Sequence, residues 1–170
     1  ADQLKIGGLL SGLVMFQVIL LTLMGSNNSA REIAGERLLF EKEKFAGLHT
    51  SSYIASKILF LLILVGIQSI WMGVFVEFLI PSLPGELMYR LFILILVNAA
   101  MTSICLGISG MMRTPEQSSL LSIYLVGFQL PLSGAVLTLP VWLEPFTRTF
   151  ISAYWGWSGN LDLMKDVKFS

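Results

Sequence analysis

Charged side chains that could make a reversible protein contact gather in the stretch SAREIAGERLLFEKEKFAG, residues 29–47. On a helix, which turns by about 100° per residue, an acidic stripe consists of Glu32, Glu36 and Glu43. A basic stripe runs through Arg37 and Lys44. Apolar residues lie in several directions between the stripes, whereas a helix floating on a membrane has one apolar face. The pattern favours a helix held between partners, and a solvated loop helix with incidental charges fits it equally well.

Candidate catalytic residues are scarce in this sequence. His49 is the single histidine, and one histidine alone makes neither a metal site nor a catalytic triad. Cys105 is the single cysteine and lies in an apolar run, where a small core residue is expected. The phosphate-binding pattern G-x-x-x-x-G-K-S/T is absent, so we expect no ATP hydrolysis, metal or cofactor in this chain alone. Basic and acidic residues number 11 each, which argues against nucleic acid as a partner.

The elements that must position the charged stretch are four apolar runs. Charged residues make up 13% of the 170 residues, against roughly 25% in soluble domains. A membrane-crossing helix needs about 20 predominantly apolar residues. We therefore predict an all-α polytopic membrane protein with four transmembrane helices, at about 6–26, 57–80, 87–110 and 117–139. A soluble bundle would need long amphipathic helices to cover these runs, and only the charged stretch offers one.

Lysine and arginine are distributed unequally among the connections between these runs. Residues 29–57 hold five of them, whereas the connection at 77–87 is acidic. Basic residues favour the cytoplasmic side of a membrane. We therefore expect residues 29–57 and 110–119 to face the cytoplasm. The 77–87 connection and the chain after Leu139 should then face outward.

Residues at the ends of the runs predict where helices begin and end. Ser29 and Glu32 form a capping box that should open an amphipathic connecting helix over about 29–47, which Gly47 can close. Thr114 and Pro115 predict the start of the last span. After that span, the segment at about 140–157 mixes polar residues with tryptophan and tyrosine, which prefer the headgroup level of a bilayer. We predict an outer re-entrant or interfacial helical segment there, with Trp142, Tyr154, Trp155 and Trp157 as its aromatic residues.

The order and spacing of several residues resemble a known family. The connecting helix of type-2 ABC exporters, specifically of the ABCG (White-like) subfamily, is similar to the series Glu32, Glu36-Arg37, Leu39-Phe40, Glu43, Gly47, Ser52-Tyr53 and Lys57. The F-S-G ending of that family's fifth span is similar to Phe128 followed by Leu132-Ser133-Gly134. The resemblance covers about Leu20 to Tyr154. It implies that residues 1–170 form a partial transmembrane domain with the second to fifth spans, and that the nucleotide-binding domain is absent from this chain.

The resemblance also implies a role for the charged stretch. In the family, this helix lies at the cytoplasmic surface and contacts the ATPase domain. The residues expected to couple that domain to the spans are Glu32, Glu36, Arg37 and Glu43, with Lys57 as a partner for a carboxylate. ATP and Mg would be bound by the nucleotide-binding domain, fused or separate. A second transporter half, identical or different, would complete the exporter in the bilayer.

A substrate cavity is implied between the first and fourth spans of two paired halves. The candidate lining residues, taken from matched positions and from polar side chains inside these spans, are Gln17, Thr22, Gly25, Tyr124, Gly127, Gln129 and Leu130. Drug pumps of the family place an aromatic residue where Gly25 stands, so a differently shaped cavity is expected. The implied activity is export of a hydrophobic or amphipathic, lipid-like or drug-like substrate by alternating access. The implied location is multi-pass in the plasma or bacterial inner membrane.

A second class of function stays open on the sequence alone. The chain could be a non-catalytic membrane scaffold whose charged cytoplasmic helix docks a partner protein. An ATPase domain encoded in the same gene, or in the next one, would favour the exporter over the scaffold.

Overall fold

The computed structural model describes residues 2–80, 86–132 and 152–166. Within these ranges the regular elements are all α-helices, which confirms the predicted all-α class. Their order is α1 (Asp2–Ser29), α2 (Arg37–Phe45), α3 (Thr50–Leu79), α4 (Leu87–Met111), α5 (Pro115–Leu132) and α7 (Ser152–Asp166).

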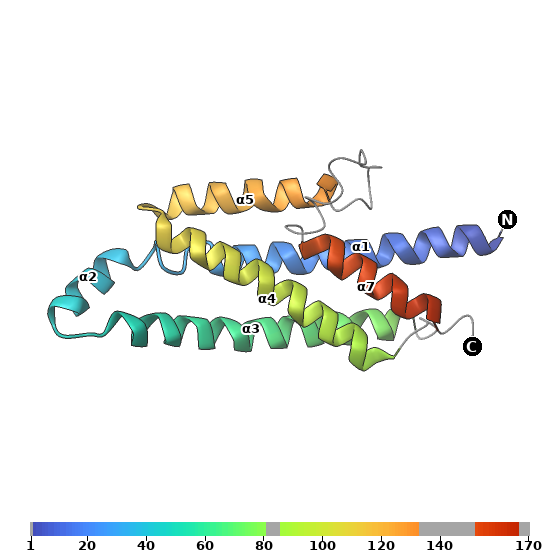
Figure 1. Ribbon diagram of the computed structural model, residues 1–170, viewed down its shortest axis with the longest axis horizontal. Coiled ribbons are helices and arrows are strands. Elements are labelled where there is room, and N and C mark those ends of the chain that lie inside the picture. Colours follow the sequence, from blue (N-terminus) through green and yellow to red (C-terminus); the bar gives the residue numbers. More distant parts are fainter. Residues whose placement is uncertain (1, 81–85, 133–151, 167–170) are drawn as a thin grey trace.

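The long helices form an elongated bundle whose middle consists of α1 and α4 (Figure 1). In the view of Figure 1, α3 lies along one side of this pair and α5 along the other, and α7 begins over α1 and runs beside α4. The helix α2 and the turn between α4 and α5 lie at one end of the bundle, which we call the α2 end. The start of α1, the end of α3 and the start of α4 lie at the opposite end. The two segments predicted to face the cytoplasm, 29–57 and 110–119, therefore share one end.

Two helices of the described residues, α3 and α4, are long and apolar enough to cross a membrane. Helix α4 contains the whole predicted span 87–110, and α3 contains the predicted span 57–80 except for residue 80. Helix α3 begins about two turns earlier than predicted. The predicted span 6–26 lies within α1. Of the predicted span 117–139, residues 117–132 lie in α5 and the remainder lies outside the described residues. The outward side of α3 is apolar, as a lipid-facing surface requires, and exposes Leu59, Ile63, Ile67, Trp71 and Phe78.

The core of the bundle lies where α1 crosses α4. Val18 and Leu21 of α1 pack against Leu94 and Val97 of α4, and all four side chains are buried. The spacing of three or four residues within each pair places them on one face of their helix. Further along α4, Met101 and Cys105 pack against Val126 of α5, which confirms that the thiol is a buried core group. Helix α4 therefore holds α1 and α5 in fixed positions relative to each other.

The connecting helix predicted over 29–47 is shorter in the structure. Ser29 ends α1 instead of capping the next helix, because its hydroxyl donates to the Gly25 carbonyl at 2.7 Å. Residues 30–36 form turns, and only Arg37–Phe45 is helical. The reason lies in α4: Ser109 Oγ accepts hydrogen bonds from the backbone N–H groups of Ile33 at 3.1 Å and Ala34 at 3.0 Å. A side chain of another helix thus replaces the helical carbonyls that these N–H groups would need.

The predicted C-terminal end of α2 and the predicted start of α5 agree with the structure. Gly47 follows α2 with a φ of 101°, a conformation that glycine adopts without strain. The N–H of Leu48 bonds the Glu43 carbonyl and the N–H of Gly47 bonds the Lys44 carbonyl, which is the Schellman arrangement. Helix α5 begins at Pro115, and the Gln117 N–H reaches Thr114 Oγ1 at 3.4 Å.

The aromatic segment predicted at 140–157 is described only from residue 152 onward, where it belongs to α7. This helix packs on α1 and α4 instead of standing apart from the bundle. Trp157 donates from Nε1 to Ser11 Oγ at 3.1 Å and packs beside Val14 and Val76, whereas Trp155 is 60% exposed. The two tryptophans therefore have different surroundings, one in the bundle and one on its surface.

Candidate functional site

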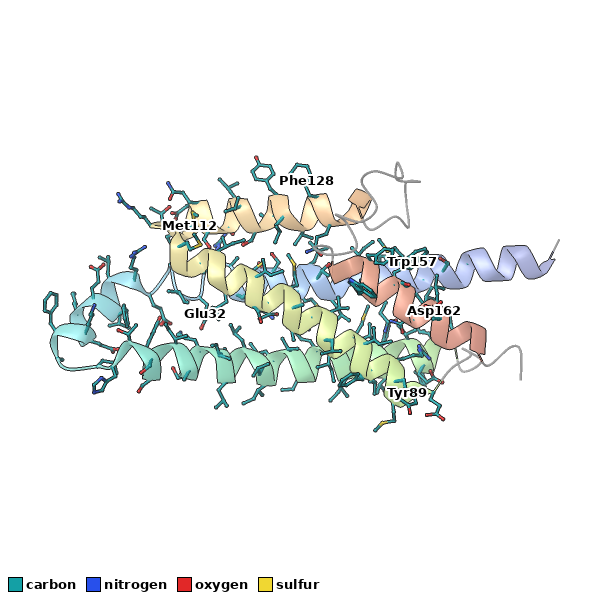
Figure 2. The ribbon with its side chains drawn as sticks, viewed as in Figure 1. Glu32, Tyr89, Met112, Phe128, Trp157 and Asp162 are labelled. Atoms are coloured by element: carbon teal, nitrogen blue, oxygen red, sulfur yellow. The ribbon has the colours of Figure 1, made fainter. Side chains whose placement is uncertain are left out.

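Lys57 lies between two carboxylates at the α2 end of the bundle. Its Nζ is 2.8 Å from Glu32 Oε1 and 2.7 Å from Glu36 Oε2. Tyr53, one turn before Lys57 on α3, donates its hydroxyl hydrogen to Glu36 Oε2 at 3.2 Å. We call these four residues the Lys57 cluster; Figure 2 labels Glu32, which lies between the start of α2 and α3. The cluster joins the turns before α2 to the first two turns of α3.

The Lys57 cluster is partly buried and has two acidic groups for one basic group. The exposed fraction of the side chain is 15% for Lys57, 24% for Glu32 and 43% for Glu36. The hydrogen bond from Lys57 lowers the pKa of Glu36, and the charge of Lys57 adds to this effect, while burial opposes it. Glu36 therefore stays ionised at neutral pH. Phe40 of α2 packs on the Tyr53 ring, with 4.7 Å between ring centroids, so that apolar contact supports the ion pairs.

The turns before α2 are also attached to α4 and α5. Arg37 donates from Nη1 to the Met112 carbonyl at 2.7 Å, just after the end of α4. Ser118 of α5 donates its hydroxyl hydrogen to the Ala30 carbonyl, and Ser109 of α4 holds two backbone N–H groups of the same turns. One short segment thus contacts α3, α4 and α5 together. A displacement of α2 would be passed to all three helices through these contacts.

Apart from the contacts of Arg37 and Phe40, helix α2 is exposed to solvent. None of its side chains is buried, and it projects at the α2 end of the bundle (Figure 1). Phe45 is 95% exposed and Leu38 is 77% exposed, and Glu43, a predicted coupling residue, is exposed as well. Large apolar side chains such as Phe45 suit the centre of a protein-binding surface, and the charged side chains around them suit its polar rim.

The predicted cavity residues on α1 point into the bundle. Gln17 donates from Nε2 to the Met72 carbonyl of α3 at 3.3 Å, and Thr22 donates to the Ile19 carbonyl of its own helix at 2.8 Å. Gly25 lies against α4, where an added Cβ would stand 2.5 Å from Asn98 Oδ1 and 2.8 Å from Thr102 Oγ1. Small residues allow such close approach between membrane helices. These three residues therefore have structural contacts within the chain.

The predicted cavity residues on α5 lie on two different faces. Gln129 is buried and donates from Nε2 to the Met101 sulfur at 3.2 Å. Tyr124 and Gly127 are exposed, beside Phe128, which points away from α4 in Figure 2. The side chain of Leu130 lies outside the described residues. The seven residues do not share one surface of the chain, and their place in a cavity between two halves stays a prediction.

A pocket does open between the two helices predicted as cavity walls, α1 and α5, at a different position. It has a volume of about 460 Å³ and is lined by Leu20, Leu23, Met24, Ser26, Asn27, Ala30, Arg31, Met72, Ser119, Ile123 and Val126. None of the six predicted cavity residues whose side chains the structure describes lines it. The prediction favoured polar residues inside the spans, yet Gln17 and Gln129 bond inward, to the Met72 carbonyl of α3 and the Met101 sulfur of α4. The spacing of Leu20, Met24 and Asn27, which places them on one face of α1, could have indicated the pocket.

Potential metal ligands do not gather in the described ranges: no group of three or more His, Cys, Asp or Glu side chains there could hold an ion. The arrangement at the α2 end instead suits a mechanical contact, in which an exposed polar helix is tied to three bundle helices.

The comparisons with known proteins agree with this arrangement. Among curated proteins, none matches the chain. The family described as ABC-2 type transporter matches it over residues 2–155, which is most of its length. The chain therefore belongs to the ABC-2 type transporter family and is a transmembrane component of such a transporter.

Proposed function

We propose that the chain is the transmembrane part of an ATP-driven exporter, related to the ABCG subfamily, in which α2 receives movement from an ATPase domain. The observation that carries this proposal is the Lys57 cluster, since Lys57 lies 2.8 Å from Glu32 and 2.7 Å from Glu36 and so joins the turns before α2 to α3. The family match supports the class of transporter, which usually works with an ABC ATPase.

The contact between α2 and the ATPase has to form and separate in each cycle. The exposed charges of α2, among them Glu41, Lys42 and Glu43, suit such a contact, because polar surfaces can separate into water at little cost. Phe45 and Leu38 supply apolar contacts to the partner. ATP and Mg bind to the ATPase, and its closure displaces α2. The Lys57 cluster and the hydrogen bonds of Arg37 pass the displacement to α3 and to the end of α4.

The same proposal assigns four spans. In addition to α3 and α4, we assign α1 and α5 to the membrane, because α1 has 28 residues and α5 contains residues 117–132 of the predicted fourth span. The α2 end then lies on the cytoplasmic side of the membrane, which would be a plasma membrane or a bacterial inner membrane. Two halves pair, and a hydrophobic or amphipathic substrate crosses between them by alternating access.

The test reconstitutes the chain with its ATPase in liposomes and measures how fast a single cysteine thiol is labelled. Asn27→Cys, in a Cys105→Ala background, places the thiol in the pocket between α1 and α5. We expect Mg-ATP to change its labelling rate by a membrane-impermeant maleimide several-fold. Lys57→Gln should abolish this response while ATP hydrolysis continues, because the link between α2 and α3 is lost.

Arg113→Gln is the matched control, since it removes one positive charge from an exposed position between α4 and α5, outside α2 and outside the Lys57 cluster. It should leave the response of the thiol to Mg-ATP intact. An unchanged response in Lys57→Gln would contradict coupling through the cluster. A thiol that never responds to Mg-ATP, even with Lys57 present, would instead favour the alternative of a membrane scaffold that docks a partner protein.

A further inference from the structure

The pocket between α1 and α5 has an apolar part and a polar end. Leu20, Leu23 and Met24 of α1 face Ile123 and Val126 of α5 across the apolar part. The polar end lies toward the α2 end of the bundle and is lined by Asn27, Arg31 and Ser119. Its volume of about 460 Å³ lies within the range of pockets that bind small organic ligands.

Arg31 gives the polar end a positive charge that no carboxylate neutralises. Its Nε donates to Ser119 Oγ at 3.1 Å, a neutral partner. No carboxylate of the described residues lies within ion-pair distance of Arg31, and the adjacent Glu32 is paired with Lys57. A guanidinium group held through Nε keeps its two terminal nitrogens for an oxyanion, which it binds in a bidentate manner.

The length of the pocket matches one leaflet of a bilayer. Eleven residues separate Leu20 from Arg31, which corresponds to about 16 Å along a helix. Half of a hydrocarbon core about 30 Å thick is nearly the same length. A chain lying beside Leu20 and Val126 would therefore stay within the cytoplasmic leaflet, with its head at the surface near Arg31.

We propose that this pocket binds an anionic amphiphile, with a phosphate or carboxylate head on Arg31, Asn27 and Ser119 and an alkyl chain between α1 and α5. The ligand has two possible sources, a resident acidic phospholipid or an acidic amphiphile that the transporter moves. The proposal rests on the proposed function in taking α1 and α5 as membrane spans. Binding itself needs neither ATP nor movement of α2.

The experiment measures binding of radiolabelled dodecyl phosphate to the full-length transporter in phosphatidylcholine nanodiscs without ATP, with empty nanodiscs as background. Arg31→Gln should weaken binding by about tenfold or more, the effect of one lost charge-assisted contact. Arg113→Gln is the matched control, since Arg113 carries the same charge at the same end but lines a different pocket. It should change binding by less than about twofold.

A second variant tests the binding of the alkyl chain, so that the proposal can still be tested if Arg31→Gln fails to fold. Ile123→Trp fills the apolar part and should weaken binding severalfold, whereas Leu121→Trp on another face of α5 should have little effect. Dodecyl maltoside, which has the same chain and a neutral head, and inorganic phosphate alone should both compete poorly. Equal competition by dodecyl maltoside, or equal binding by Arg31→Gln and Arg113→Gln, would overturn the proposal.

The source of the ligand is assigned by two further measurements on the same sample. Stimulation of ATP hydrolysis by dodecyl phosphate would identify a transported amphiphile. Displacement of dodecyl phosphate by phosphatidic acid, without such stimulation, would identify a resident phospholipid. Because binding is measured without ATP, failure of coupling through Lys57 would leave this result unchanged, and the two proposals can fail separately.

Discussion

Ion pairs lie near both ends of α3, and they are built differently. At the end opposite α2, Arg90 Nη1 lies 2.9 Å from Glu77 Oε2, and the Arg90 side chain is only 2% exposed. At the α2 end, Lys57 lies between Glu32 and Glu36 and is 15% exposed. The first pair joins two helices that follow each other in the chain. The second joins α3 to the turns before a separate, projecting helix.

The difference shows how similar chemical groups can fix one end of a bundle and leave the other adjustable. Arg90 has one carboxylate partner among the described residues, so breaking that pair would leave a buried charge uncompensated. Lys57 has two partners and can keep one while the other moves. We infer that the Arg90 end is rigid and that the Lys57 end transmits movement.

The largest effect should come from Arg90→Gln. The change leaves Glu77, which is 34% exposed, without its partner and also removes the packing of the buried Arg90 side chain, so we expect the free energy of unfolding to fall by about 3 kcal/mol. Circular dichroism during titration with a denaturing detergent measures this change. Arg113→Gln, at an exposed position, should stay within about 0.5 kcal/mol of the wild type. A loss below 1 kcal/mol for Arg90→Gln would remove the contrast between the two ends.

Lys57→Gln should cost less stability than Arg90→Gln and have a larger effect on coupling. The lysine is partly exposed and water can solvate the released carboxylates, so we expect a loss of about 1–3 kcal/mol. The same denaturation series, run beside the ATP hydrolysis assay, separates the two effects. A stability loss equal to that of Arg90→Gln would make the Lys57 cluster a rigid element as well.

Neutralising Glu32 and Glu36 one at a time and together tests whether both carboxylates share Lys57. Glu32→Gln or Glu36→Gln each leaves Lys57 with one carboxylate, so each should cost less than about 1 kcal/mol. The double variant should cost more than the sum, because the second change removes the last partner. Additive losses in the two singles and the double would show that the carboxylates do not share Lys57.

The smallest effect should appear in the dependence on pH. Because Lys57 lowers the pKa of Glu36, this carboxylate stabilises the fold above its ordinary pKa of 4.5, and the stabilisation is lost as the pH falls through the lowered value. The difference in melting temperature between wild type and Glu36→Gln should therefore be present at neutral pH and shrink below pH 4.5. A constant difference down to pH 3 would argue against the pair.

Much of the bundle could be predicted from hydropathy and end signals. Long apolar runs placed α3 and α4, and local chemistry at Pro115 and Gly47 marked helix ends, because such caps depend on neighbouring residues only. The turns at 30–36 could not be predicted. They depend on Ser109, more than seventy residues away in the sequence. Its hydroxyl oxygen accepts hydrogen bonds from two backbone N–H groups that would otherwise bond to carbonyls within a helix.

The sequence predicted the Lys57 cluster in part but did not predict the pocket between α1 and α5. Lys57 was expected to meet a carboxylate because of its charge and its place at the start of a span, and it meets two. The pocket between α1 and α5 was missed because polar residues inside spans were taken as its lining. Gln17 and Gln129 form hydrogen bonds inside the bundle. The pocket is lined instead by residues on other faces of α1 and α5, such as Met24 and Ile123.

The central claim, that movement of α2 reaches the spans through the Lys57 cluster, is tested most directly by exchanging its charges. Lys57→Glu should abolish the response of the Asn27→Cys thiol to Mg-ATP, because three carboxylates then repel each other. Adding Glu36→Lys restores an opposite charge 2.7 Å away in the wild-type geometry and should recover at least about half of the response. A full response in Lys57→Glu alone, or no recovery in the folded double variant, would contradict the claim.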